Sequence, residues 1–337
     1  MTINIAVATY DAIVLGCDSL SSVVEPAVSF RSAGFARDAN GVELVDASGN
    51  KVISTANLTN YVTNVFSGAQ KMFLLYEDQD TCVAAVTAGL ATLCGVTIAG
   101  VASRFRRTTS GSVFDTVESV ALEFMAFVRR EWEREVDFAN AEEEMRPFFP
   151  DVQFIVGGYG KDDERGRLFK IWIAPNVIRE TVSSTATGTG ACWGGQAEFV
   201  ERLLMGVDAQ VEMVITDIVT DALNARAKAT VEQVTEQLAA AGVQIPDNLK
   251  LEGEREELNL PWRDSSADID FANLPTQYAV DFVELLVNTQ SGMQRFANGV
   301  ATVGGRTHVG VLRRGEKFEM INEPQLVHNH TGYAHDL

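Results

Sequence analysis

Two apolar segments joined by a short turn near the start of the chain constrain its fold most. Residues 3–8 alternate larger and smaller side chains, which is the two-residue period of a strand, and residues 12–18 form a second, more apolar run. An antiparallel hairpin centred near Tyr10 pairs residues whose numbers add to about 20. The pattern therefore predicts an antiparallel sheet in which Thr2 lies opposite Asp18, on the same face.

Three more hairpins and several helices follow along the chain. The hairpins are expected at residues 71–76 with 81–87, 152–158 with 168–173, and 307–312 with 317–321. Helical spacing is expected from about residue 90 through Phe105 and over 114–136, 196–204, 208–241 and 278–296. Antiparallel hairpins interleaved with helices predict an α+β fold, a four-layer αββα sandwich of two sheets covered by helices on their outer faces.

The chain length allows one large domain. We expect a single domain over residues 1–322 with insertions at about 22–68 and 208–275. The first insertion is rich in Ser, Ala, Asn and Gly, and the second carries many charges and prolines. Residues 323–337 are expected to form a flexible tail.

Charge and cysteine usage limit the classes of partner. A formal net charge of −19 argues against nucleic-acid binding, which rests on Lys and Arg contacts to phosphate, and against binding to anionic membranes. No stretch reaches the roughly 18 apolar residues of a membrane-spanning helix. The four cysteines show no CxxC spacing and are typical of a reducing compartment. These features predict a cytoplasmic protein.

Thr2 is the candidate nucleophile. Methionine aminopeptidases remove Met1 when the next side chain is small, which would leave Thr2 at the amino terminus. An N-terminal threonine combines a hydroxyl with an α-amine whose ordinary pKa is about 7.7–8.0, so the amine can serve as the base that activates the hydroxyl. Many ordinary proteins also begin with Met-Thr, so the rest of the site must come from other segments.

Five parts of the chain, three of them made of two stretches, carry a resemblance to a known family. They are Thr2-Ile-Asn-Ile-Ala-Val with Ile13-Val-Leu-Gly-Cys-Asp18-Ser19, then Lys71-Met-Phe-Leu-Leu, Thr87-Ala-Gly89-Leu-Ala, Phe154-Ile-Val-Gly-Gly-Tyr-Gly with Leu168-Phe-Lys-Ile-Trp-Ile, and Gly304-Gly305 with Val309-Gly-Val-Leu. Their order and spacing resemble a proteasome β-subunit or its bacterial HslV-type relative, as a divergent member of these N-terminal-nucleophile hydrolases.

The resemblance implies a catalytic set of Thr2, Asp18, Lys71 and Gly89. The Thr2 hydroxyl would attack a carbonyl carbon, and the Thr2 amine, directly or through a water, would take the proton. A Lys71 ammonium would lower the pKa of both Thr2 groups, and Asp18 would hold Lys71 charged and oriented. The backbone N–H of Gly89 would face the oxyanion, where such a donor is worth about 3 kcal/mol.

Each of these residues also has a plain structural interpretation. Thr2 could be an ordinary strand residue, Asp18 a turn or cap residue, Lys71 an edge-strand residue and Gly89 a turn glycine. We favour the catalytic interpretation because all four occur together at the spacing of the family.

The chain also departs from the family pattern. Fifty-two residues separate Asp18 from Lys71, whereas about fifteen are usual in the family. No Ser stands at residues 193–195, where the family has a supporting one, and its supporting Asp and Ser align with Val300 and Val303. Asn298 or Thr302 could substitute for them.

The leading hypothesis from the sequence is a threonine endopeptidase-like hydrolase that cleaves peptide or amide bonds through an acyl-enzyme on Thr2. The alternatives are a catalytically impaired, ring-forming structural subunit and a transpeptidase that uses the same acyl-enzyme. The resemblance implies a homo-oligomer and a peptide or protein substrate, and it leaves an ATP-dependent unfoldase partner open. No cofactor and no metal are expected, since His328, His330 and His335 lack an accompanying acidic or Cys ligand set.

Overall fold

The computed structural model describes residues 2–27, 34–38, 40–54, 59–143, 146, 149–182, 188–243 and 266–322. The chain divides into two compact units, one formed by Met1–Ala197 with Asp270–Leu337 and the other by Glu198–Ile269. The first unit holds all the strands among the described residues, and each unit is described by itself below.

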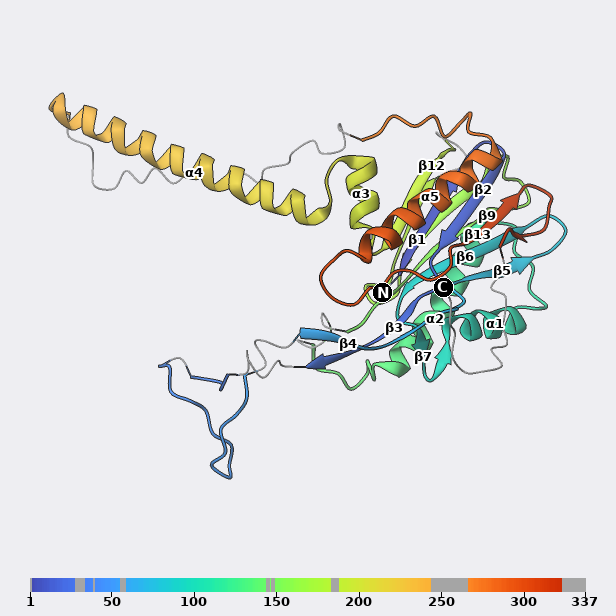
Figure 1. Ribbon diagram of the computed structural model, residues 1–337, viewed down its shortest axis with the longest axis horizontal. Coiled ribbons are helices and arrows are strands. Elements are labelled where there is room, and N and C mark those ends of the chain that lie inside the picture. The colour runs from blue at the N-terminus through green and yellow to red at the C-terminus, as the bar shows by residue number, and fades with distance from the viewer. Residues whose placement is uncertain are drawn as a thin grey trace. The chain divides into compact units, whose positions relative to one another are not determined.

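Two five-stranded antiparallel sheets form the centre of the first unit (Figure 1). The first sheet has the order β12-β1-β2-β13-β14, with β1 at Ile3–Ala8, β2 at Ala12–Cys17, β12 at Gly190–Gly195, β13 at His308–Arg313 and β14 at Glu319–Met320. The second sheet has the order β11-β10-β9-β6-β5, with β5 at Met72–Glu77, β6 at Cys82–Gly89, β9 at Val152–Tyr159, β10 at Arg167–Trp172 and β11 at Val177–Val182.

The remaining strands among the described residues form two smaller hairpins. They are β3 (Ser21–Ala27) with β4 (Thr59–Phe66) and β7 (Thr92–Leu93) with β8 (Val96–Thr97). Apart from Ser21, the first of them lies within the predicted insertion at about 22–68.

Helices cover the outer face of each sheet. The helices α1 (Ile98–Thr108) and α2 (Val117–Glu135) pack on the second sheet, and α5 (Thr276–Gln294) packs on β1, β2 and β13 of the first (Figure 1). The layers therefore run α5, first sheet, second sheet, then α1 with α2. This arrangement confirms the predicted α+β, four-layer αββα sandwich.

Two apolar cores hold the layers together. The side chains between the sheets include Leu15, Met72 and Ile155, all buried. A larger core between the second sheet and α1 and α2 is built from aromatic rings, in which Phe124 contacts Phe105 and Phe154 with ring centroids 5.2 and 4.9 Å apart. Burying side chains of this size contributes about 1.5–3 kcal/mol each, so both faces of the second sheet are well stabilised.

The register of the first hairpin differs by one residue from the prediction. Ala8 pairs with Ile13 and Asn4 with Cys17, so paired numbers add to 21. The cause is a four-residue turn, in which the Thr9 amide donates to the Ala12 carbonyl (2.9 Å) and the Thr9 hydroxyl oxygen accepts from the Ala12 amide (3.1 Å). The prediction that Thr2 lies opposite Asp18 was therefore wrong, because the register places Ile3 there.

Other helices and strands also differ from the prediction in where they begin or whether they were expected. The helix expected from about residue 90 begins at Ile98, because the Thr97 hydroxyl caps it by accepting from the Gly100 amide, and β7 and β8 occupy the residues before it. The strands β11 and β12 were not predicted. The segment Gly-Ala-Cys-Trp-Gly-Gly of β12 shows no alternation, so its strand structure comes from pairing with β1.

The second unit contains α3 (Glu198–Met205) and α4 (Ala209–Ala240). Asp208 caps α4, because its carboxylate accepts from the Val211 amide at 2.7 Å and pairs with Arg202 of α3. None of the residues of α4 is buried. The predicted single domain with an insertion at 208–275 stays a prediction, and the predicted tail at 323–337 lies outside the described residues.

No helix within the part of the chain that the structure describes is both long and apolar enough to cross a membrane.

The contact between β2 and α5 gives the first prediction. A Cβ atom on Gly16 would lie 2.2 Å from Cγ1 of Val283, so Gly16→Ala should overpack this layer and lower the free energy of unfolding by about 1–3 kcal/mol. Urea denaturation measures this change. Gly292→Ala in α5 is the matched control, since its Cβ would meet nothing within 4 Å and the variant should be neutral or slightly more stable. An unchanged stability of Gly16→Ala would contradict the packing described here.

Candidate functional site

A buried ion pair lies where the first hairpin meets the start of β5. Lys71 Nζ is 2.9 Å from Asp18 Oδ1, and the two side chains are 7% and 1% exposed. The Lys71 ammonium also donates to the Leu20 carbonyl. The ion pair therefore joins two segments that are far apart in the sequence.

The Asp18 carboxylate accepts hydrogen bonds from several backbone amides around it. Besides Lys71, it accepts from the amides of Ile3 (3.2 Å) and Leu20 (3.1 Å), and from the Gly304 amide (3.0 Å). Hydrogen bonds from charged and backbone donors offset the large cost of removing a carboxylate from water. Asp18 thereby fixes the end of β2, the start of β1 and the loop before β13 relative to one another.

Thr2 lies at the start of β1 and is 4% exposed. Its carbonyl accepts from the Gln196 amide at 2.8 Å. Gly195, the residue before Gln196, has φ +73°, and a Cβ there would be 1.9 Å from the Thr2 carbonyl oxygen. The end of β12 is thus closed around the backbone of Thr2, and only glycine fits at that turn.

The end of β6 approaches the same place. A Cβ on Gly195 would also meet Cβ of Ala88 at 3.0 Å, so the residue before Gly89 lies beside the carbonyl of Thr2. Gly89 itself has φ +99°, and a Cβ there would be 2.3 Å from the Asp151 carbonyl oxygen. A side chain at residue 89 would therefore clash with the neighbouring strand.

The four predicted site residues lie at one end of the sandwich, but only two of them are shown in direct contact. Asp18 and Lys71 are in direct contact. Thr2 is connected to them through its neighbour Ile3, whose amide donates to Asp18, and Gly89 adjoins Ala88 beside the Thr2 backbone. Their catalytic roles stay a prediction.

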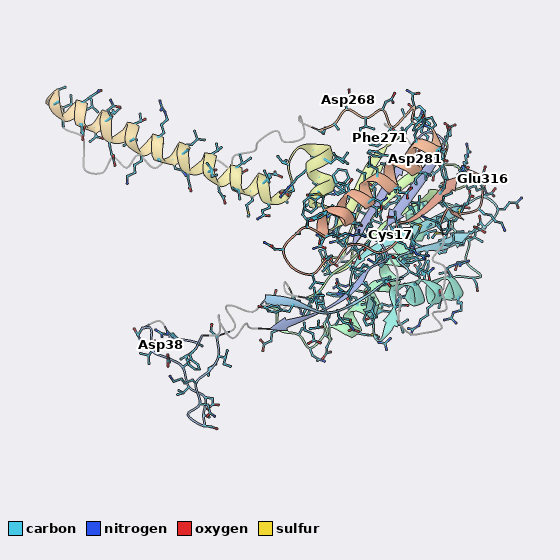
Figure 2. The ribbon with its side chains drawn as sticks, viewed as in Figure 1. Cys17, Asp38, Asp268, Phe271, Asp281 and Glu316 are labelled. Carbon is cyan, nitrogen blue, oxygen red and sulfur yellow. The ribbon has the colours of Figure 1, made fainter. Side chains whose placement is uncertain are left out.

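Two titratable side chains on the inner face border the ion pair. Cys17, which lies among the strands of the sandwich (Figure 2), pairs with His308 across β2 and β13. Burial raises the pKa of the Cys17 thiol, Asp18 raises it further, and Lys71 opposes them. Burial also lowers the pKa of His308 against the opposing effect of Asp18, with smaller lowering effects from Lys71 and Arg306. Both shifts favour the neutral forms of these side chains.

The sequence did not reveal the residues that hold the backbone around Thr2. Gln196 and Gly304 act through their backbone amides, which leave no signature in side-chain type. Ser19 was noted only as part of a motif, and its hydroxyl oxygen accepts from the Arg306 amide at 2.7 Å. Of the two suggested substitutes, Thr302 is joined to Gln196 by a side-chain hydrogen bond of 2.7 Å.

Comparisons with known proteins find similar solved structures but no family model and no curated relative. Among solved structures, two forms of Anbu from Hyphomicrobium sp. strain MC1 are similar. The Gly-1 mutant is 13% identical with a TM-score of 0.43, covering 95% of this chain and 87% of its own, and the other is 14% identical with a TM-score of 0.42, covering 95% and 85%. Anbu (ancestral beta-subunit) from Yersinia bercovieri is 12% identical with a TM-score of 0.42, covering 95% and 87%.

These matches correct the family expected from the sequence. The prediction of a proteasome β-subunit or HslV-like member was wrong, because the similar structures are Anbu proteins. The resemblance rested on the order and spacing of short, separate segments, and no single segment was distinctive.

The buried ion pair gives the second prediction. Lys71→Met would leave the Asp18 carboxylate buried without its cation, so the free energy of unfolding should fall by about 3–5 kcal/mol. The double variant Asp18→Asn with Lys71→Met should lose less than the two single variants together, because the uncompensated charge is gone. Chemical denaturation of the four proteins measures this coupling.

Lys51→Met is the control for loss of a lysine. Lys51 pairs with Glu43 at 2.6 Å, but both side chains are substantially exposed, so the stability should change little. Additive effects of the two changes in the double variant would show that Asp18 and Lys71 do not depend on each other.

Proposed function

We propose that the chain is a threonine-type N-terminal-nucleophile hydrolase that cleaves peptide or amide bonds through an acyl-enzyme on Thr2. In this proposal Met1 is removed first, so that the Thr2 α-amine is free to act as the base. Asp18 and Lys71 are the supporting charges, and the Gly89 amide is the oxyanion donor.

The buried Lys71–Asp18 pair beside Thr2 is the observation that supports this proposal most. A buried ion pair seldom improves stability over apolar residues of similar size, so its presence favours a chemical role. The pair is joined to the Thr2 residue by the Ile3 amide, one peptide unit away from the hydroxyl. A cation at this position favours the neutral form of the α-amine, which is the form that accepts a proton.

The proposed reaction balances without any cofactor. The Thr2 hydroxyl oxygen bonds to the carbonyl carbon of the substrate while its proton passes to the α-amine. The protonated amine then gives that proton to the leaving nitrogen, the carbon–nitrogen bond breaks, and an ester on Thr2 remains. Water adds to the ester carbon, the bond to the Thr2 oxygen breaks, and the carboxylic acid leaves as the hydroxyl is restored.

The remaining parts of the proposal follow from composition and from the sequence-based expectations. The substrate is a peptide or protein, and the chain assembles with copies of itself. The formal net charge of −19 disfavours nucleic acid and anionic membranes as partners. The described cysteines are free thiols, in keeping with a cytoplasmic protein.

A panel of fluorogenic peptide amides tests the proposed activity. The purified protein should release the fluorophore from at least one of them. Thr2→Ala should reduce the rate at least about a hundredfold, since it removes the nucleophile, whereas Thr2→Ser should keep measurable activity because it retains a hydroxyl beside an α-amine. Intact mass should show that Met1 is absent from the wild type and from both variants.

Two results would contradict the proposal. Cleavage that persists in Thr2→Ala would place the activity elsewhere or in a contaminant. A wild type that has lost Met1 but cleaves none of the panel would favour the structural subunit over the hydrolase.

A further inference from the structure

A chain of two hydrogen bonds connects the loop before β13 to the backbone of Thr2. The Thr302 hydroxyl donates to Oε1 of Gln196 at 2.7 Å, and the Gln196 amide donates to the Thr2 carbonyl at 2.8 Å. Thr302 is 3% exposed, so water competes little for its hydroxyl. Three segments that are distant in sequence therefore meet at the carbonyl of Thr2.

The peptide unit between Thr2 and Ile3 is held at both ends. Its carbonyl oxygen accepts from Gln196, and its N–H donates to the Asp18 carboxylate at 3.2 Å. Once Met1 is removed, this peptide unit is the only covalent connection between Thr2 and the protein. Its orientation then decides where the hydroxyl and the α-amine of Thr2 lie.

The loop before β13 contacts the partners of both of these hydrogen bonds, Gln196 and Asp18. Thr302 anchors Gln196, while Gly304, two residues later, donates from its amide to Asp18 Oδ2 at 3.0 Å. Val303 between them is fully buried, which keeps the loop in place. Residues 302–304 thus link the carbonyl side of the peptide unit to its N–H side.

Gln196 needs a side-chain anchor because of the turn before it. Gly195 has φ +73° and lies too close to the Thr2 carbonyl to carry a Cβ. Gly195 is the last residue of β12 that pairs with β1, so beyond it the ladder no longer holds the chain, and the hydrogen bond of the Gln196 side chain helps to fix the direction of the Gln196 amide. Thr302 donates this hydrogen bond.

We propose that Gln196 and Thr302 form a clamp that orients the nucleophile, which makes both of them positioning residues for the reaction at Thr2. This inference rests on the proposed function, because only a reactive Thr2 requires such orientation. Without the Thr302 hydroxyl the Gln196 side chain loses its anchor, the Gln196 amide releases the Thr2 carbonyl, and the hydroxyl leaves its reactive geometry.

Thr302→Val tests the clamp, because valine keeps the shape of threonine and removes the hydroxyl. Thr307→Val is a closely matched control, since the Thr307 hydroxyl also donates to an amide oxygen, Oδ1 of Asn288, at 2.7 Å. The Thr307 pair lies on the same closing segment, and its hydrogen bond joins that segment to α5 instead of to Gln196. Thr302→Ser restores the hydroxyl and should rescue the effect.

Hydrogen exchange, covalent labelling and thermal melting are measured on the wild type and the three variants. Residue-resolved hydrogen exchange reports the protection of the Gln196 amide, which should fall at least about tenfold in Thr302→Val and stay unchanged in Thr307→Val and Thr302→Ser. The rate of covalent labelling by a peptide epoxyketone should fall about ten- to a hundredfold in Thr302→Val alone, with the melting temperature close to that of Thr307→Val.

The outcomes separate this inference from the proposed function. A wild type that the epoxyketone does not label would overturn the proposed function and with it the role of the clamp in catalysis. A labelled wild type, together with unchanged Gln196 protection or an unchanged labelling rate in Thr302→Val, would overturn the clamp alone. An equal loss of rate in Thr307→Val would show a general loosening of the segment and would also overturn it.

Discussion

The buried contact between Lys71 and Asp18 is the interaction on which the rest of the site depends. A carboxylate and an ammonium can leave water only where other groups replace their hydration, and here the replacements are backbone donors from the first hairpin and from the loop before β13. Each replacement fixes a segment of chain in place. Asp18 follows β2 of the first sheet and Lys71 precedes β5 of the second, so the ion pair holds the two sheets together at this end. Thr2 lies at the same end, at the start of β1.

The layers of the sandwich hold the two sheets close enough for this ion pair to form. Helices on both outer faces leave the inner faces of the sheets free to pack on each other, and the apolar core between them keeps β1 and β5 in a fixed relation. Thr2 is then held through a single peptide unit, by Asp18 on one side and Gln196 on the other. Rigid sheets supply the position, and a few hydrogen bonds at their ends supply the orientation.

Much of this architecture could be predicted from the sequence, because period-two apolar runs and helical spacing are local signals. The contact of Asp18 with Lys71 was expected through the family resemblance and is present, although fifty-two residues separate them. The hairpin register was missed by one residue, since it depends on how the Thr9 hydroxyl bonds within the turn. The strand β12 and the role of Gln196 were missed as well, because both arise from pairing with β1 and from no local pattern. The prediction of a proteasome β-subunit or HslV-like member was wrong as well, because the similar solved structures are Anbu proteins.

The central claim is that, once Met1 is removed, the Thr2 hydroxyl acts as the nucleophile and the Thr2 α-amine acts as its base. Peptide mapping by tandem mass spectrometry, after reaction of the purified protein with a peptide epoxyketone, tests it most directly. The account predicts one adduct on the amino-terminal peptide, located on Thr2, with no Met1 before it. An adduct on another residue, such as the exposed thiol of Cys94, or a reacted protein that still carries Met1, would contradict the account.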